Sequence, residues 1–147
     1  MRVITGTARG RRLKELEGYE TRPTTDRVKE GIFNIIQFDI EGRKVLDLYA
    51  GTGQLGIEAL SRGAAGAVFV DQRRDAASLI RDNLKLTGLE DRARVVCGDA
   101  AAFLSSAGEK FGLIFIDPPY AANLWENTIK AISQFDILSN HGIIAVS

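Results

Sequence analysis

Residues 44–56 read KVLDLYAGTGQLG and join a short apolar run to a glycine-rich loop. The run over 44–50 predicts a buried strand, with a helix directly after the loop. Gly51 and Gly53 allow a sharp turn in which a ligand can touch the backbone, and Gly56 allows close packing of helix on sheet. Taken alone, the spacing G-x-G-x-x-G fits a dinucleotide site, an S-adenosylmethionine (SAM) site or a tight structural turn.

The rest of the chain alternates between short apolar runs and amphipathic segments. Further strands are predicted at 67–71, 93–99, 112–117 and 142–147, and helices at 56–63, 73–87, 100–107 and 123–135. Near-continuous apolar strands separated by helices indicate a parallel sheet covered on both faces, and right-handed crossovers make it doubly wound. The predicted fold is therefore α/β, with a mostly parallel Rossmann-like sheet in a core at 41–147.

Residues 1–40 predict a small extension of this core. The runs 2–5 and 12–16 predict a hairpin, and an amphipathic helix follows as far as about Phe38. Its start can be capped by Thr24, Thr25 or Asp26. Its apolar face comprises Val28, Ile32, Phe33, Ile35 and Ile36.

The fifth predicted strand runs up to Ser147, the last residue of the sequence. A sheet that stopped there would leave an apolar edge strand exposed, which natural proteins avoid. We therefore expect further strands of the sheet beyond this sequence.

Three aspartates lie at or near the ends of predicted strands. Asp71 can accept hydrogen bonds from ribose hydroxyls or cap the helix at 73–87. Asp99 can accept from an adenine amino group or cap the helix at 100–107. Asp47 discriminates between ligands, because its carboxylate would repel a pyrophosphate beside the loop but attract the ammonium group of SAM.

Asp117, Pro118, Pro119 and Tyr120 form a D-P-P-Y corner after the most apolar predicted strand. The two prolines stiffen the turn and remove two N–H donors, which leaves the Asp117 carboxylate and the Pro118 carbonyl as acceptors. Paired acceptors suit an exocyclic amine, which presents both hydrogens while its nitrogen attacks a methyl group. Tyr120 offers a flat face on which a base can stack. The structural alternative is a stiff loop with Tyr120 as a lid on the core.

The first and fourth predicted strands should be neighbours at the switch point of the sheet, so that the two motifs share one crevice. This predicts a SAM-dependent methyltransferase of an exocyclic amine. An NAD(P)-dependent oxidoreductase would explain the glycine loop and Asp71, but not Asp47 or D-P-P-Y. A DNA adenine-N6 methyltransferase uses the same corner, yet 147 residues leave no room for a separate target-recognition region. A non-catalytic binding module would not need D-P-P-Y.

The pairing of DLYAGTG with DPPY resembles class I SAM-dependent amino-methyltransferases. Three segments narrow the resemblance to the bacterial 16S rRNA guanine-N2 methyltransferase family: RVITGTARGRRL (2–13), RPTTDRVKEGIFNII (22–36) and LDLYAGTGQLGIEALSRGA (46–64). The resemblance covers essentially the whole chain, and its most specific part is Arg22-Pro23-Thr24 with Arg27, Glu30, Phe33 and Asn34.

The resemblance implies a SAM cofactor and, as substrate, a guanine N2 amine in small-subunit rRNA, either free or in an assembly particle. It assigns cofactor contacts to Asp71, Asp99 and the segment 47–53, which includes Tyr49, and it assigns the target amine to 117–120. The segment 22–27, with Thr24 and Arg27, would line the cofactor side of the cleft. Similar sequences more often carry Glu in place of Asp71, and family members add closing strands after the fifth.

The 19 basic and 19 acidic residues balance, so net charge gives no sign of a polyanionic partner. Residues 1–14, however, contain five basic residues and no acidic one. We expect an RNA backbone to be held there by Arg9, Arg11, Arg12 and Lys14, because phosphate contacts depend on local charge. The alternative is a solvated surface hairpin.

No apolar run approaches the roughly 20 residues of a membrane span, and the N-terminus lacks the apolar core of a signal peptide. The single cysteine, Cys97, excludes an intramolecular disulfide. These features predict a cytoplasmic protein without membrane contact. Cys97 is expected in the core and His141 in a polar turn at 139–142, without a catalytic role. No Cys or His cluster suggests a metal site.

Overall fold

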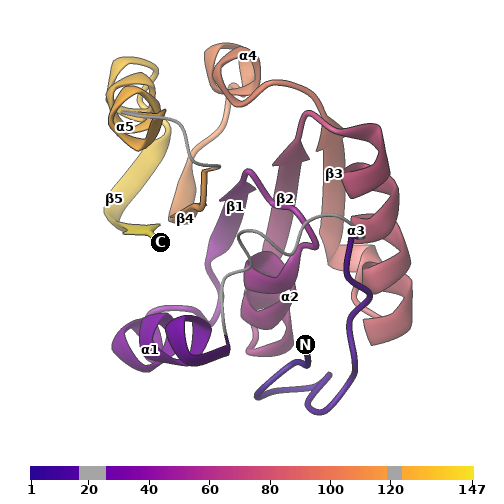
Figure 1. Ribbon diagram of the computed structural model, residues 1–147. Helices are drawn as coiled ribbons and strands as arrows, with labels where there is room; N and C mark the ends of the chain where they lie inside the picture. Colours follow the sequence, from indigo (N-terminus) through magenta and orange to yellow (C-terminus); the bar gives the residue numbers. More distant parts are fainter. Residues whose placement is uncertain (17–25, 119–123) are drawn as a thin grey trace.

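The computed structural model describes residues 1–16, 26–118 and 124–147. Its centre is a parallel five-stranded sheet in the order β3-β2-β1-β4-β5 (Figure 1). The strands are β1 Lys44–Leu48, β2 Gly66–Asp71, β3 Ala93–Cys97, β4 Phe111–Ile116 and β5 Leu138–Val146. From β1 the chain winds outward to β3 and then returns to the other side of β1. The predicted doubly wound α/β fold is confirmed.

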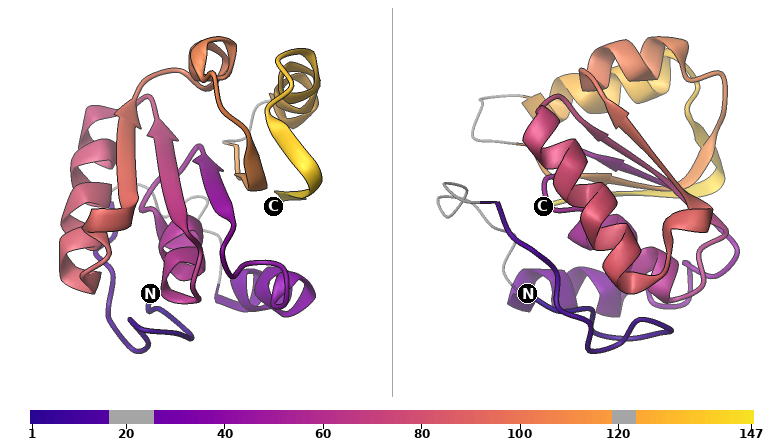
Figure 2. Two further views of the ribbon diagram at one scale, coloured as in Figure 1. Left: turned by 180° about the vertical axis from the view of Figure 1, so that it is seen from behind. Right: turned by 90° about the vertical axis from the view of Figure 1, so that its right-hand side faces the viewer.

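Helices cover both faces of the sheet (Figures 1 and 2). Their bounds are α1 Asp26–Ile36, α2 Gln54–Ser61, α3 Arg74–Thr87, α4 Ala100–Ser106 and α5 Leu124–Gln134, with a short 3-10 turn η1 at Glu90–Arg92. One buried cluster contains residues of α1, α2 and α3, and a second contains residues of α4 and α5. Side chains alternate across the sheet, so Val45 joins the first cluster and Leu46 the second. No helix in the described segments is long and apolar enough to span a bilayer.

The N-terminal segment 1–16, hereafter the arm, folds back on itself as predicted, although it forms no regular strand. A single antiparallel bridge joins Arg2 to Arg12, and Leu13 N donates to Met1 O at 2.9 Å. The arm is fixed by Glu58 of α2, whose carboxylate accepts from Ile4 N at 2.8 Å and Thr5 N at 3.0 Å.

The buried face of α1 differs from the predicted one. Ile35 is 83% exposed and Val28 46% exposed, whereas Lys29 is fully buried beside Phe33. The Lys29 ammonium lies 3.1 Å from Glu58 Oε1 and donates to Arg2 O at 3.1 Å. A buried charge needs such partners, and here they attach α1 to α2 and to the arm.

Two expectations about single residues are wrong. Cys97 is exposed and not buried, because it ends β3, one of the two edge strands of the sheet. His141 does not lie in a turn between elements, because β5 begins at Leu138. It occupies an irregularity within β5, where its φ is 61° and the register with β4 shifts.

Candidate functional site

The glycine loop and Asp117 leave the sheet side by side. β1 and β4 are neighbours, with Asp47 opposite Phe115 and Leu48 opposite Ile116. The residues that follow, Tyr49 on one strand and Asp117 on the other, therefore emerge at the same edge of the sheet. This confirms that the first and fourth strands adjoin at the switch point. Pro119, Tyr120 and Thr24 lie outside the described residues.

The loop turns through left-handed backbone at Tyr49, Gly51 and Gly53, whose φ angles are 57°, 61° and 82°. A Cβ on Gly56 would lie 2.4 Å from the Phe69 ring, so only glycine lets α2 approach the sheet this closely. A Cβ on Gly51 would meet no atom within 4 Å. Open space therefore lies over the loop backbone at Gly51, where a ligand was expected.

Gly53 has more crowded surroundings than Gly51. The sequence predicts that Gly53, like Gly51, lets a ligand touch the backbone. A Cβ at Gly53 would instead lie 3.2 Å from Ile80 of α3 and 3.4 Å from Ile57 of α2. The positive φ adds strain for any other residue. A substitution at Gly53 would therefore perturb packing and backbone conformation together, so Gly51 is the cleaner probe of ligand binding.

Asp47 is buried directly beneath the loop, with 1% of its surface exposed. Its Oδ2 accepts from Gly56 N at 2.9 Å, while Oδ1 has no hydrogen-bond partner within the described part of the chain. Burial raises the pKa of Asp47 well above its ordinary value, and the charges of Asp117 and Asp71 raise that pKa further. A buried acceptor of this kind is costly unless a donor or a positive charge completes it.

Asp71 ties the end of β2 to the glycine loop. Its Oδ2 accepts from Gly51 N at 3.0 Å, and its Oδ1 accepts from Arg73 N at 2.9 Å. Neither bond caps α3, whose first residue is Arg74. A carboxylate has about four lone-pair sites, so Asp71 retains capacity to accept from a ligand hydroxyl.

Asp99 caps α4, as the alternative interpretation had it, because its Oδ2 accepts from Ala102 N at 3.1 Å. Its side chain is exposed and can accept further bonds. Arg27, the other described residue assigned to the cofactor by resemblance, is exposed on the first turn of α1. The side chains of Asp99 and Arg27 are therefore both accessible to a ligand from the solvent side.

Tyr49 connects the glycine loop to α5. Its hydroxyl lies 2.7 Å from Thr128 Oγ1, which itself donates to Leu124 O at 2.8 Å, so Tyr49 is the donor. Burial raises the pKa of Tyr49, which keeps the phenol protonated and able to donate. Thr128 was not identified from the sequence, although a threonine four residues before the buried Ile132 marks a polar position on a buried face.

The side chain of Asp117 is half-buried at the end of β4. Its Oδ1 accepts from Ser147 Oγ at 2.7 Å, and its charge reaches Asp47 strongly enough to raise that pKa. Three carboxylates, those of Asp47, Asp71 and Asp117, therefore gather around one sheet edge. Such an edge attracts a positively charged ligand and an amine that can donate hydrogen bonds.

Only part of the basic arm lies near this edge of the sheet. Thr7 N donates to Ser61 O at the end of α2, and Arg11 Nη1 donates to Leu86 O in the last turn of α3. Both helices begin beside the loops and run back, so the turn of the arm lies at the opposite end of the molecule (Figure 2, right). Only the part near Lys14 returns, where Asn83 bonds both Lys14 O and Thr52 O.

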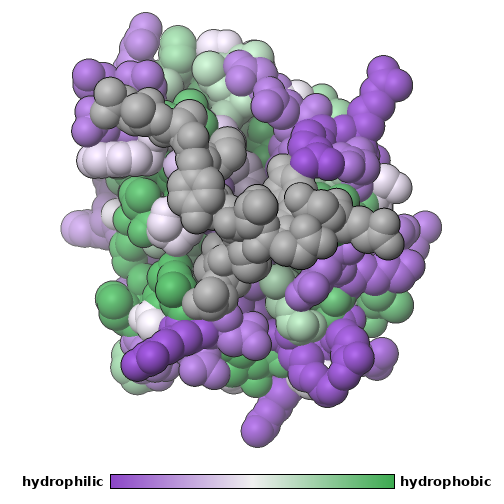
Figure 3. Space-filling model, in the orientation of Figure 1, coloured by the Kyte–Doolittle hydropathy of each residue, from purple (hydrophilic) through white to green (hydrophobic). Residues whose placement is uncertain are grey.

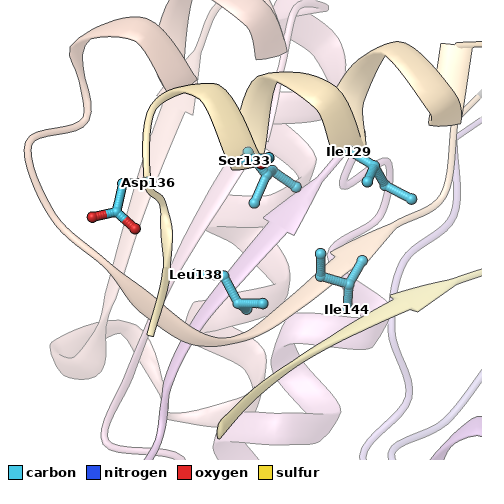
Figure 4. Close-up of a pocket in the computed structure, with 6 residues that line it drawn as sticks. Ile129, Ser133, Asp136, Leu138 and Ile144 are labelled. Carbon is cyan, nitrogen blue, oxygen red and sulfur yellow. The ribbon is translucent and has the colours of Figure 1, made fainter. Parts of the chain in front are cut away.

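A separate surface hollow lies between α5 and β5 (Figure 4). It is lined by Ile129, Ile132, Ser133, Asp136, Leu138 and Ile144. Asp136, its one charged residue, already pairs with Lys110 at 2.7 Å. The hollow offers apolar contact and no group suited to catalysis. Within the described residues, no three His, Cys, Asp or Glu side chains are placed to hold a metal ion.

Comparison with known proteins places the chain among methyltransferases. The Bacillus subtilis protein YlbH, provisionally named an rRNA methyltransferase, is 44% identical over 147 residues, which cover 98% of this chain and 80% of YlbH. Ribosomal RNA small subunit methyltransferase D of Escherichia coli K12 is 39% identical, with 99% and 73% covered. The solved structure of the Escherichia coli protein yhhF superposes with a TM-score of 0.90 at 40% identity, covering 99% of this chain and 79% of that one.

The family described as Conserved hypothetical protein 95 matches residues 1–147, the full length of the sequence. The sheet order of this chain and the sequences of its glycine loop and D-P-P-Y motif are those expected of a Rossmann-like methyltransferase. The chain therefore belongs to the Conserved hypothetical protein 95 family of methyltransferases.

Proposed function

We propose that the chain transfers a methyl group from SAM to the exocyclic N2 amine of a guanine in the rRNA of the small ribosomal subunit. The observation that carries the proposal is the meeting of the glycine loop, the buried Asp47 and Asp117 at the adjacent ends of β1 and β4. The small-subunit rRNA methyltransferases among its relatives support rRNA as the substrate class.

The residues at this edge fit SAM. Open space over Gly51 allows a ligand to approach the backbone, and the unpartnered Oδ1 of Asp47 would face the positively charged methionine end. Asp71 and Asp99 would accept from the ribose hydroxyls and the adenine amine. Tyr49 would hold the loop in place through Thr128, while Thr24 and Arg27 would close the cofactor side. SAM supplies a methyl group on a sulfonium, whose loss leaves a neutral thioether.

The D-P-P-Y corner would act on the target base. The Asp117 carboxylate and the Pro118 carbonyl would accept the two amine hydrogens, which favours a localised lone pair on nitrogen. The amine becomes much more acidic once it is methylated, so Asp117 can receive its proton then and no strong base is needed first. Pro119 would keep the turn rigid and Tyr120 would stack on the base.

The target amine lies on a base edge that is paired or stacked in helical RNA. The enzyme must therefore act on a loop or extrude the base, at a cost of a few kcal/mol. Arg9, Arg11, Arg12 and Lys14, all exposed, would hold the RNA backbone. We place this activity in the cytoplasm, where the small subunit or its assembly particle is the partner.

The decisive experiment is mass spectrometry of the nucleosides of small-subunit rRNA from cells that lack this gene. We expect N2-methylguanosine to fall by one residue per rRNA and to return with the wild-type gene. No change on deletion would refute the rRNA activity, whereas return with an Asp117→Ala gene would show that Asp117 is not required for it. Loss of a different methylated nucleoside would retain the methyltransferase and overturn guanine N2 as its target.

Gly51→Ala is expected to weaken SAM binding at least 10-fold, because the added methyl group occupies the space proposed for the cofactor. Gly88→Ala is the matched control, since Gly88 also has a positive φ (70°) and no atom within 4 Å of a Cβ. Both variants should lose a similar stability of about 1 kcal/mol from left-handed strain. Calorimetric titration with SAM measures the difference, and equal affinities in the two variants would place the cofactor elsewhere.

A further inference from the structure

The outward face of α3 carries three basic residues in one stripe. Arg74, Arg81 and Lys85 follow one another by seven and four residues, a spacing that puts them on the same side of a helix. The buried side of the helix comprises Ala76, Ala77, Leu79, Ile80, Asn83 and Leu84. All three basic residues are exposed, and none forms an ion pair with a residue in the described segments.

The acidic residues of α3 lie to one side of this stripe and are already occupied. Asp75 is held by Arg73 through a bond of 2.9 Å to its Nε. Asp82 lies 3.9 Å from the Lys14 ammonium, toward the arm. The exposed side of α3 therefore carries the basic stripe and, beside it, two aspartates that are already paired. Hydrophilic side chains are frequent on the side of the molecule where α3 lies (Figure 3).

The stripe connects two places that the proposed function leaves apart. α3 begins three residues after Asp71, at the edge of the cofactor loop, and its last turn touches Arg11 of the arm. From Arg74 to Lys85 the helix rises about 16 Å, the length of about four to five stacked nucleotides of one strand. The turn of the arm is at the far end of α3 and cannot by itself hold nucleotides close to the target base.

We propose that the RNA backbone runs along the outer face of α3, with its phosphates held by Arg74, Arg81 and Lys85, between the active-site edge and the arm. This rests on the proposed rRNA substrate. A row of separated, unpaired cations is suited to bind the phosphates of a nucleic-acid strand. Such contacts position the strand without reading its sequence. Guanidinium groups at Arg74 and Arg81 can each hold a phosphate through two N–H donors.

The test compares two triple variants of the full chain. Arg74/Arg81/Lys85→Ala removes the stripe, and Arg94/Lys110/Lys130→Ala removes the same charge from exposed residues on β3, before β4 and on α5. Binding of small-subunit rRNA from cells lacking the gene is measured against salt concentration. Loss of three phosphate contacts should reduce the log–log slope by about 2, at about 0.7 per contact for single strands.

The control variant should keep the wild-type slope, and both variants should bind SAM with unchanged affinity. In the stripe variant we expect a raised KM for RNA with kcat preserved, and Arg74→Lys/Arg81→Lys should restore most of the slope. Equal slopes in the stripe variant and the control would overturn the proposal. Methylation of the same rRNA by the wild-type protein is measured in parallel. If the proposed function is wrong, the wild type will not methylate this rRNA, and that result is separate from the comparison of salt slopes.

Discussion

Asp117→Ala is expected to reduce methyl transfer by about 100-fold or more while SAM still binds. Positive charge develops on the amine nitrogen as its bond to the methyl group forms, and removing a positioned group that stabilises such charge costs about this much. The Asp117 side chain lies at the end of β4, beside Asp47 and not beneath the glycine loop. Single-turnover transfer of labelled methyl groups to unmethylated rRNA measures the loss.

Two variants show whether the effect is specific. Asp117→Asn keeps one acceptor oxygen without the charge and should retain part of the activity. Asp136→Ala removes an exposed aspartate from the other end of the sheet, just before β5, and should leave activity unchanged. Titration with SAM should give wild-type affinity for all three. If affinity and activity fell together in Asp117→Ala, Asp117 would belong to the cofactor site and not to the site of the base.

The sheet could be predicted because its strands are short apolar runs, of which the three central ones, β1, β2 and β4, are buried on both faces. Such runs are visible without any knowledge of their partners, and the handedness rule then determines how they are connected. The placement of Asp47 and Asp117 at one edge followed directly from β1 and β4 adjoining at the switch point. The part of the site that depends on strand ends was therefore accessible from the sequence.

Features that depend on a distant partner were not accessible. Periodicity puts Val28 and Ile35 on the apolar face of α1, but Lys29 is the residue buried, because Glu58 lies opposite and satisfies its charge. In the same way, the exposure of Cys97 depends on β3 being an edge strand, which no local pattern reveals.

The site also contains interactions that only the folded backbone shows. Gly53 cannot be told from Gly51 in the motif, yet a side chain at Gly53 would crowd Ile80, whereas one at Gly51 would meet no atom within 4 Å. Asn83 bonds both Lys14 and Thr52, which joins the arm to the glycine loop. A buried asparagine on a helix face is the one signal in the sequence that could have revealed this connection.

Asp47→Asn is expected to weaken SAM binding by about 10- to 100-fold, the usual value of a hydrogen bond to a charged group. The amide keeps the size of the side chain and can still accept from Gly56 N, so the loop should keep its shape. What it loses is the negative charge next to the methionine ammonium and the sulfonium. Asp71→Asn provides a comparison, because it leaves Asp47 intact and alters the carboxylate proposed for the ribose.

Asp47→Asn should also make the ligand-free protein more stable than the wild type at neutral pH. The pKa of Asp47 is raised in the folded chain, chiefly by burial and further by the charges of Asp117 and Asp71. The folded protein then keeps a proton that the unfolded chain has already lost, so the free energy of unfolding falls as pH rises from the ordinary carboxyl range toward the raised pKa. Asparagine has no proton to lose, so this fall should be absent from Asp47→Asn.

The affinity for SAM should rise with pH, whereas the stability of the ligand-free protein falls. A cation beside Asp47 favours its ionised form, so SAM binding releases a proton and the wild-type affinity should rise with pH over the window in which the ligand-free protein loses stability. Asp47→Asn should bind SAM weakly with no such rise. Calorimetry in buffers of different ionisation enthalpy counts the released protons, and thermal unfolding across pH follows the stability. Wild-type affinity in Asp47→Asn at every pH would show that the orphaned oxygen faces no cation, and the cofactor's positive end would then lie away from β1.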